Sequence, residues 1–417
     1  MWSKIVEYLK DACLVARIQK AFGVETHYGN SIKGCLHSET RDATSRKSDS
    51  NNCPSNRGEI RENGYATNER NSVDVTKSVK NPSYTISNYF WYYLFLFGTE
   101  LGDEIFYCTF IPFWFWNIDG AVGRRIFFVW SIVMAMGQML KDVMCWPRPA
   151  CPPVVRLQSK WSEEYGMPST HAMMAISIPF SVVLFTMNRY IYPVSIGWTI
   201  AFLWCTLVCM SRLYLGMHTV LDIIAGVMLA IALMIPLVPL VDMIDYYLFT
   251  NLWSVTAFIT TTIGIIVYYP CSKKWTPTRG DTAMVLSVVA GIYLGTWFNY
   301  NAGKMMASTI SPPYNISWPS YAMLGRLIVR IFIGLCSIIA IRSVCKFLSY
   351  EIMCAMLRVN AKDLMKSRNY SGDKNKNLVD LVHKYLTCFM IGYNTVYLMP
   401  HAFAMMGIDR PTFYIDM

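Results

Sequence analysis

A histidine and an aspartate four residues apart, His218 and Asp222, have the spacing of a pair that acts together in catalysis. They end a cluster that reads Ser211-Arg212-Leu-Tyr-Leu-Gly-Met-His218-Thr-Val-Leu-Asp222. Residues four apart share one face of a helix, so the carboxylate can accept one imidazole N–H, fix the tautomer and orient the ring. We therefore predict that His218 is a catalytic nucleophile and that Asp222 orients it.

A second cluster supplies cations. It reads Lys141-Asp-Val-Met-Cys-Trp-Pro-Arg148-Pro149, with the lysine at the end of an apolar run and the arginine between two prolines. A lysine offers a point charge, whereas the planar fork of an arginine matches the oxygens of a phosphate. Side chains that only anchor a membrane segment would not need a backbone stiffened by proline. We predict that Lys141, Arg148 and Arg212 bind a phosphate group.

The third cluster, Met167-Pro168-Ser169-Thr170-His171, directly precedes an apolar run. Ser169 is a good helix N-cap, and the free backbone N–H groups of such a helix start bind phosphate, so Ser169 and Thr170 are predicted to join the phosphate site. His171 is predicted to be the general acid and base, protonating the leaving group and later activating water. Taken alone, this cluster also fits an ordinary helix cap beside a surface histidine.

Together the clusters predict the chemistry of a phosphate monoester, which carries about two negative charges at neutral pH. Lys141, Arg148 and Arg212, here named the cationic cradle, would neutralise that charge in the ground and transition states. A phosphohistidine would form and then be hydrolysed. No Asp, Glu and His cluster with metal-ligand spacing occurs, so we expect no metal and no cofactor. We expect the cradle at one face of a bilayer, with the His218 imidazole facing an opening.

The segments that must position these clusters are apolar enough to cross a membrane. Of the 417 residues, 54% are hydrophobic and 15% charged, whereas about a quarter of the residues of a soluble domain are charged. We predict an all-α, polytopic transmembrane helical bundle of about eight to ten spans, each needing about 20 apolar residues. Residues 87–117 form one bent span or two short ones, and the other spans cover roughly 126–140, 172–188, 192–210, 219–240, 253–269, 282–299, 319–341 and 381–408.

The chain divides into three parts by composition. Residues 1–26 alternate apolar and basic side chains, which predicts an amphipathic interfacial helix or, equally, a surface helix packed on the rest of the protein. Residues 27–85 are rich in Asn, Ser, Arg, Lys and Glu, and are predicted to be a disordered cytosolic tail. Residues 86–417 form the transmembrane domain, with its catalytic core at 124–240.

The net charge of +10 and the 13 cysteines have ordinary explanations in a membrane protein. Basic loops that set topology and contact anionic headgroups account for the charge. Nucleic acid is not an expected partner, because no basic module interleaved with aromatic residues occurs. Most cysteines lie in apolar runs without a CxxC pair, which favours small buried side chains over disulfides or zinc. The expected partners are the bilayer and a lipid substrate, and a homo-oligomer is left open.

The three clusters resemble the signature of the type 2 phosphatidic acid phosphatase superfamily: Lys-x6-Arg-Pro, Pro-Ser-Gly-His and Ser-Arg-x5-His-x3-Asp. The one departure is Thr170 in place of glycine, and threonine keeps the backbone N–H. The flanks Cys145-Trp-Pro-Arg-Pro, Pro152-Pro-Val-Val and Glu164-Tyr-Gly-Met-Pro-Ser-Thr-His-Ala-Met look like those of the sphingosine-1-phosphate phosphatase branch.

This resemblance implies a haloperoxidase-like helical core and a lipid phosphate phosphatase acting on sphingosine 1-phosphate and dihydrosphingosine 1-phosphate. It also implies residence in the endoplasmic reticulum membrane with a lumenal active site. Arg124, Arg125 and Arg189 then fall on the opposite, cytosolic side. Two alternatives remain: a broader phosphatase of phosphatidate and lysophosphatidate, and a non-catalytic transporter on the same fold.

Overall fold

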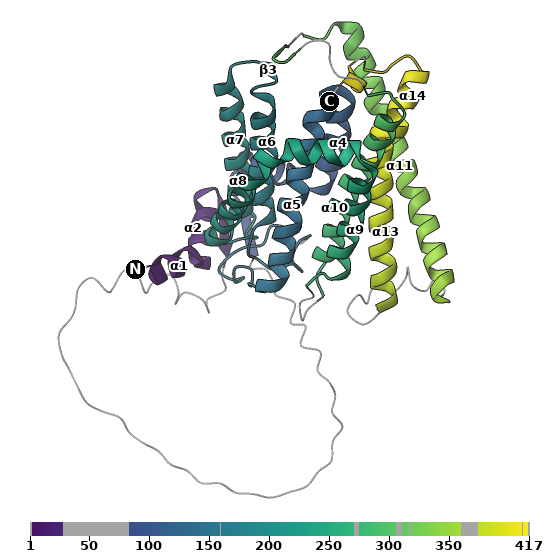
Figure 1. Ribbon diagram of the computed structural model, residues 1–417. Helices are drawn as coiled ribbons and strands as arrows, with labels where there is room; N and C mark the ends of the chain where they lie inside the picture. The colour runs from purple at the N-terminus through teal and green to yellow at the C-terminus, as the bar shows by residue number, and fades with distance from the viewer. Residues whose placement is uncertain are drawn as a thin grey trace, which may run out of the picture.

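The computed structural model describes residues 2–27, 83–158, 160–270, 275–305, 311–316, 318–359, 374–410 and 412–415. Helices dominate this part of the chain, and most run up and down between the two ends of one bundle (Figure 1). In chain order the elements are α1 (Trp2–Leu9), α2 (Ala12–Ala21), β1 (Val24–His27), β2 (Ser83–Ile86), α3 (Tyr89–Glu100), α4 (Glu104–Asn117), α5 (Gly120–Met144), α6 (Thr170–Thr186), β3 (Tyr190–Ile191), α7 (Val194–Tyr214), α8 (Val220–Thr250), α9 (Leu252–Val267), α10 (Thr278–Asn301), β4 (Tyr314–Asn315), α11 (Tyr321–Leu357), α13 (Lys374–Tyr393), η1 (Asn394–Leu398), α14 (Met399–Met405) and η2 (Phe413–Ile415).

Five of these helices are long and apolar enough to cross a membrane: α5, α7, α8, α10 and α11. Two shorter apolar helices, α6 and α9, run beside them. The prediction of a polytopic, all-α membrane protein is thereby confirmed. The helices α8 and α11 extend well past their predicted ends at 240 and 341, because hydropathy marks only the apolar part of a helix and not where its backbone hydrogen bonds stop.

The region 87–117 is two helices rather than one bent span. Asn88 caps α3 by accepting the Phe90 N–H at 3.0 Å, and the helix ends at Glu100. The segment 101–103 separates it from α4, in which Pro112 is tolerated. This break places polar residues of α3 and of the segment 101–103 beside the three clusters.

The core lies around α5, which is buried along most of its length, whereas most residues in the apolar stretches of α7, α8 and α11 are only partly buried or exposed. Aromatic residues of α4 and α5 pack against one another in this core, with Phe115 and Phe127 at a ring-centroid distance of 6.0 Å. At the end of the bundle that holds the start of α5, a buried ion pair joins Arg124 to Asp245 of α8 at 3.0 Å, and Tyr293 of α10 donates to the same carboxylate. Outward-facing apolar side chains suit contact with lipid.

Residues 1–26 do not form one helix. Asp11 accepts the Cys13 N–H at 2.9 Å and so starts a second helix, α2, after α1 has ended. Of the two readings of this segment, α2 fits the packed surface helix, because Val15 is fully buried and Gln19 nearly so. In contrast, α1 exposes Ile5, Val6 and Tyr8, as an interfacial helix would.

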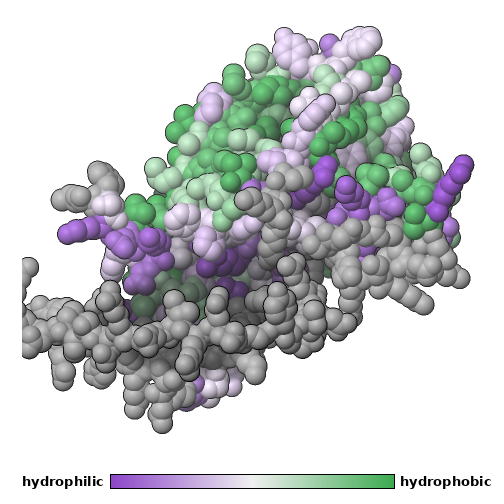
Figure 2. Space-filling view, turned by 90° about the horizontal axis from the view of Figure 1, so that it is seen from below, coloured by the Kyte–Doolittle hydropathy of each residue, from purple (hydrophilic) through white to green (hydrophobic). Residues whose placement is uncertain are grey.

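The N-terminal elements lie at the same end of the bundle as the three clusters (Figure 1). β1 pairs antiparallel with β2, with His27 opposite Ser83, so both ends of the predicted tail are held there; residues 28–82 lie outside the described residues. The predictions of a cytosolic tail and of a lumenal active site are therefore incompatible, because both ends of the tail lie at the end of the bundle that holds the site. Seen from this end, hydrophilic residues form a band across the middle of the view (Figure 2).

Candidate active site

All the predicted site residues come together at one end of the bundle. Lys141 lies in the last turn of α5, Arg212 in the last turn of α7, and Ser169 caps α6. Two contacts between clusters show the convergence directly: Lys141 Nζ donates to Thr170 Oγ1 at 3.1 Å, and the Ser169 N–H donates to the Asp222 carbonyl at 3.1 Å. The ends of α5 and α7 and the start of α6 thus build one site from residues far apart in sequence.

The two cations of the second cluster share a carboxylate that the sequence analysis did not assign to the site. Lys141 Nζ lies 2.5 Å from Glu164 Oε2, and Arg148 Nη2 lies 3.8 Å from the same oxygen. Arg148 Nε also donates to the Glu164 carbonyl at 2.9 Å. Burial opposes ionisation of Glu164, but the charges of Lys141 and Arg148 outweigh it and hold its pKa below the usual value. Glu164 is therefore an ionised part of the site.

Arg212 is fully buried, and among the described residues only one of its three guanidinium nitrogens has hydrogen-bond acceptors. Its Nη1 donates to Thr99 Oγ1 at 2.5 Å and to Gln158 Oε1 at 3.4 Å. Its Nε and Nη2 have no hydrogen-bond partner within the described part of the chain. Buried donors without acceptors are rare because each costs desolvation free energy, so such a group calls for a specific explanation. An anion with several oxygens would supply the missing acceptors.

His218 lies in the segment between α7 and α8, with its Nε2 toward Arg148. Arg148 Nη1 is 3.5 Å from His218 Nε2 and donates to the Met217 carbonyl at 2.8 Å. Burial, followed by the charges of Arg148, Arg212 and Lys141, holds the pKa of His218 well below the ordinary value. The imidazole is therefore neutral at neutral pH, as a nucleophile must be.

The predicted bond between Asp222 and His218 is not formed in this structure. His218 Nδ1 is 3.7 Å from Asp222 Oδ2, which is too long for a hydrogen bond. The Asp222 carboxylate instead accepts the Thr219 N–H at 2.8 Å, and Thr219 Oγ1 accepts the Asp222 N–H at 3.2 Å. This capping box starts α8 and fixes the carboxylate beside the ring.

His171 lies in the first turn of α6, as predicted. Ser169 Oγ accepts the Ala172 N–H at 3.4 Å, which confirms Ser169 as the N-cap. The His171 ring packs against Trp161 with its centroid 6.1 Å away, and its Nε2 has no partner among the described residues. The start of α6 thus presents an imidazole and its own backbone N–H groups to the same site.

Comparison with known proteins agrees with this geometry. Residues 123–245 match the PAP2 superfamily, which nearly coincides with the predicted core at 124–240. Sphingosine-1-phosphate phosphatase 1 of Rattus norvegicus is 37% identical over 325 residues, covering 78% of this chain and 74% of that protein. Sphingosine-1-phosphate phosphatase 2 of Homo sapiens is 35% identical over 327 residues, covering 78% and 80%.

A more distant relative, a dihydrosphingosine 1-phosphate phosphatase of Saccharomyces cerevisiae, is 25% identical over 273 residues, covering 63% of this chain and 65% of its own. No solved structure gives a significant match. The chain belongs to the sphingosine-1-phosphate phosphatase family of the PAP2 superfamily. It is accordingly a membrane phosphatase.

Three glycines let the elements of this phosphatase site approach closely. A Cβ on Gly102 would lie 2.7 Å from His171 Cδ2, and one on Gly226 of α8 would lie 2.6 Å from the Ser169 carbonyl oxygen. A Cβ on Gly166 would lie 2.9 Å from the Pro147 carbonyl oxygen. None of the three was predicted from the sequence, although Gly226 follows Asp222 by four residues and so shares its helix face.

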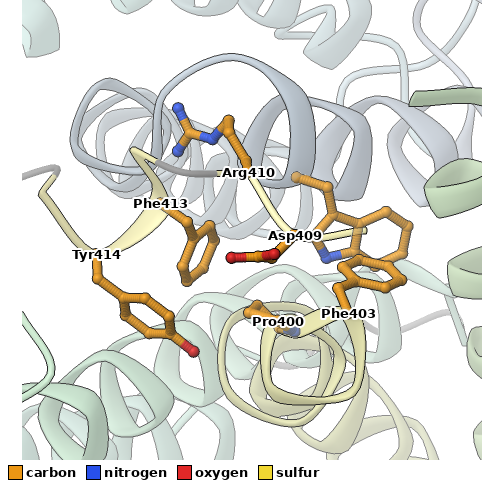
Figure 3. Close-up of a pocket in the computed structure, with 7 residues that line it drawn as sticks. Pro400, Phe403, Asp409, Arg410, Phe413 and Tyr414 are labelled. Atoms are coloured by element: carbon orange, nitrogen blue, oxygen red, sulfur yellow. The ribbon is translucent and has the colours of Figure 1, made fainter. Parts of the chain in front are cut away.

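The prediction that His218 faces an opening is wrong for this structure. His218 is 1% exposed and Arg212 0%, because the loop 145–169 and the segment 101–103 cover them. Lys160 of the loop pairs with Asp103 at 2.7 Å. Figure 3 shows a pocket of about 10 Å³ that is lined by Trp116, Pro400, Phe403, Asp409, Arg410, Phe413 and Tyr414. It lies beside α14, at the other end of the bundle (Figure 1). Substrate must displace part of this cover.

Proposed function

We propose that this phosphatase removes phosphate from sphingosine 1-phosphate and dihydrosphingosine 1-phosphate, without a metal ion, through a phosphohistidine on His218. The observation that carries the proposal is the buried Arg212 guanidinium, two of whose nitrogens lack an acceptor within the described residues, beside a neutral imidazole. The activities for which the relatives are named support these two substrates.

The site residues divide the reaction between them. The cationic cradle and the backbone N–H groups at the start of α6 hold the phosphoryl oxygens. His218 Nε2 attacks phosphorus, the bond from phosphorus to the alkoxide oxygen of the lipid breaks, and His171 gives that oxygen a proton. Water then attacks the phosphohistidine while His171 takes a proton from it, which releases inorganic phosphate and restores both imidazoles.

Fixed cations take the role that metal ions have in many phosphatases. The described residues contain no group of three or more His, Cys, Asp or Glu side chains that could hold a metal ion. Lys141, Arg148 and Arg212 instead provide three positive charges next to the imidazole. We expect hydrolysis of sphingosine 1-phosphate by the purified protein to be unchanged in excess EDTA. Loss of activity in EDTA that added Mg²⁺ or Mn²⁺ restores would contradict the metal-independent mechanism.

The phosphohistidine can be trapped. Incubation with sphingosine 1-phosphate labelled on phosphorus, followed by an alkaline quench, is expected to leave label on the protein. The label is expected to disappear in acid, since the phosphorus–nitrogen bond of phosphohistidine is acid-labile. Unlabelled phosphatidate in the same mixed micelles is the competitor for substrate class. Equal competition by phosphatidate would favour a broader lipid phosphate phosphatase.

Arg148→Gln is expected to move the acid limb of kcat/KM to higher pH. Burial and the charges of Arg148, Arg212 and Lys141 lower the pKa of His218, and Asp222 faces it at 3.7 Å. Removing one positive charge raises that pKa, so the neutral, reactive imidazole is lost at a higher pH. The substrate's own ionisation near pH 6 is the same for both proteins, so the difference in limbs reports on His218. An acid limb at the same pH in both proteins would count against His218 as the titrating group.

A further inference from the structure

We propose that Gln19, on the N-terminal helix α2, is a positioning residue for the phosphatase reaction. It joins the loop that carries Arg148 to the end of the helix that carries Arg212. The inference rests on the function proposed above and extends the site to a residue far upstream of position 123, where the family match begins.

The side-chain amide of Gln19 makes three hydrogen bonds to backbone groups. Its Nε2 donates to the Val155 carbonyl at 2.7 Å and to the Tyr214 carbonyl at 2.8 Å. Its Oε1 accepts the Val155 N–H at 3.0 Å. Gln19 is 1% exposed, so these bonds are shielded from water. Only a side chain with two donors and an acceptor in one plane makes this set.

The two segments that Gln19 joins carry the groups that surround the phosphate. Val155 follows Arg148 in the loop 145–169, and Tyr214 lies two residues after Arg212 and four before His218. A direct backbone bond from the Leu157 N–H to the Leu215 carbonyl, at 3.2 Å, runs beside the glutamine. The position of Arg148 relative to Arg212 and His218 therefore depends on this junction.

Gly216 shows how tightly the junction is packed. Its φ is +69°, and a Cβ there would lie 2.2 Å from the Val155 carbonyl oxygen and 3.0 Å from Gln19 Nε2. The loop, the helix end and the glutamine amide therefore leave no room for a side chain between them. A displacement of about 1 Å of a catalytic group can lower the rate about 10²-fold, so loss of the amide should act on turnover.

Val15, also on α2, provides a control that distinguishes a positioning role of Gln19 from a role in folding. Val15 is fully buried and packs in an apolar cluster with Val154 and Leu213, but its side chain makes no hydrogen bonds. If α2 only helps the chain to fold, loss of Val15 and loss of Gln19 should have equivalent effects. If Gln19 positions the loop, only its loss should lower turnover by the folded protein.

The experiment compares Gln19→Ala, Gln19→Met and Val15→Ala in the full-length protein, with kcat and KM for sphingosine 1-phosphate measured per amount of monodisperse protein. Methionine keeps the length of the side chain and the apolar packing of α2, but removes all three hydrogen bonds. Both Gln19 variants are expected to lower kcat about 10- to 100-fold with KM within about threefold. Val15→Ala is expected to lower the thermal midpoint while kcat stays within about threefold.

Three results would overturn the proposal. The first is a Gln19→Met protein with kcat within about threefold of wild type. The second is an equal fall in kcat for Val15→Ala. The third is that neither Gln19 variant yields folded protein, because that assigns the residue to folding. The proposed function is tested separately in the same assay by wild type and His218→Ala. If these two behave as expected while the Gln19 variants keep their turnover, only the positioning role fails.

Discussion

His218→Ala is expected to lower kcat for sphingosine 1-phosphate by at least about 10³-fold, because it removes the imidazole that we propose forms the phosphohistidine. His218 is buried beside Arg148, with its Nε2 3.5 Å from the guanidinium, and alanine has no nucleophilic atom at this position. The measurement is single-turnover release of phosphate, together with the alkaline-quench labelling described above. Both the turnover and the label should be lost.

His401→Ala is the matched control. His401 lies beside Lys304, and its helix α14 is at the opposite end of the bundle (Figure 1). It should keep wild-type turnover and the protein-bound label. A His218→Ala protein that retained more than about a tenth of wild-type kcat would remove His218 as the nucleophile. Turnover lost with the label intact would place the covalent bond on another residue.

Arg212→Met is expected to lower kcat about 10²- to 10³-fold, the usual loss when a group that stabilises transition-state charge is removed. The same substitution should leave the thermal midpoint unchanged or raise it. Arg212 is a fully buried cation with two nitrogens unpartnered within the described residues, and replacing a poorly compensated buried charge by an apolar side chain is often stabilising. The substitution should therefore lower activity without lowering thermal stability.

Phosphate binding provides the second measurement for Arg212. Inorganic phosphate should raise the thermal midpoint of wild type, because it binds the folded state, and should raise that of Arg212→Met much less. Arg212→Lys should not restore turnover, since lysine lacks the planar fork. Arg125→Ala is the control for loss of a positive charge far from the site: Arg125 lies near the start of α5, where it pairs with the exposed Asp242 at 2.8 Å and lies 4.0 Å from the buried Asp245. This variant should keep the phosphate-induced rise in the thermal midpoint. A destabilised but active Arg212→Met would contradict this account.

The site residues could be predicted from the sequence because their chemistry is concentrated at the ends of apolar runs. Lys141, His171 and Arg212 each lie within one turn of a helix end, so a hydropathy pattern with correct spans already places them at membrane faces. Ser169 as an N-cap follows from local rules alone. The convergence of the three clusters was predicted because cations and imidazoles must surround the same phosphate group.

Contacts between segments far apart in sequence could not be predicted in this way. Glu164 joins Lys141 across 23 residues, and Gln19 joins Tyr214 across 195; neither pairing has a periodic signal. Asp222 was expected to bind the imidazole because their spacing allows it, but the same carboxylate also fits a capping box with Thr219, and that local bond is the one formed. Burial of His218 depends on how the loop 145–169 folds back, which composition does not encode.

Because β1 and β2 lie beside the phosphatase site, the amino-terminal part of the chain is at the same end of the bundle as the site. N-terminal residues such as Val24 pack with Tyr214 and Met217 next to His218, whereas Tyr414 packs near Trp116 at the opposite end. The amino-terminal elements and the carboxyl-terminal residues therefore lie at opposite ends of the bundle (Figure 1). If these two ends lie on opposite sides of the membrane, an epitope at the amino terminus should share its compartment with the released phosphate, and one at the carboxyl terminus should report the other. Protease protection of the two epitopes in sealed microsomes would thus reveal into which aqueous space the products escape.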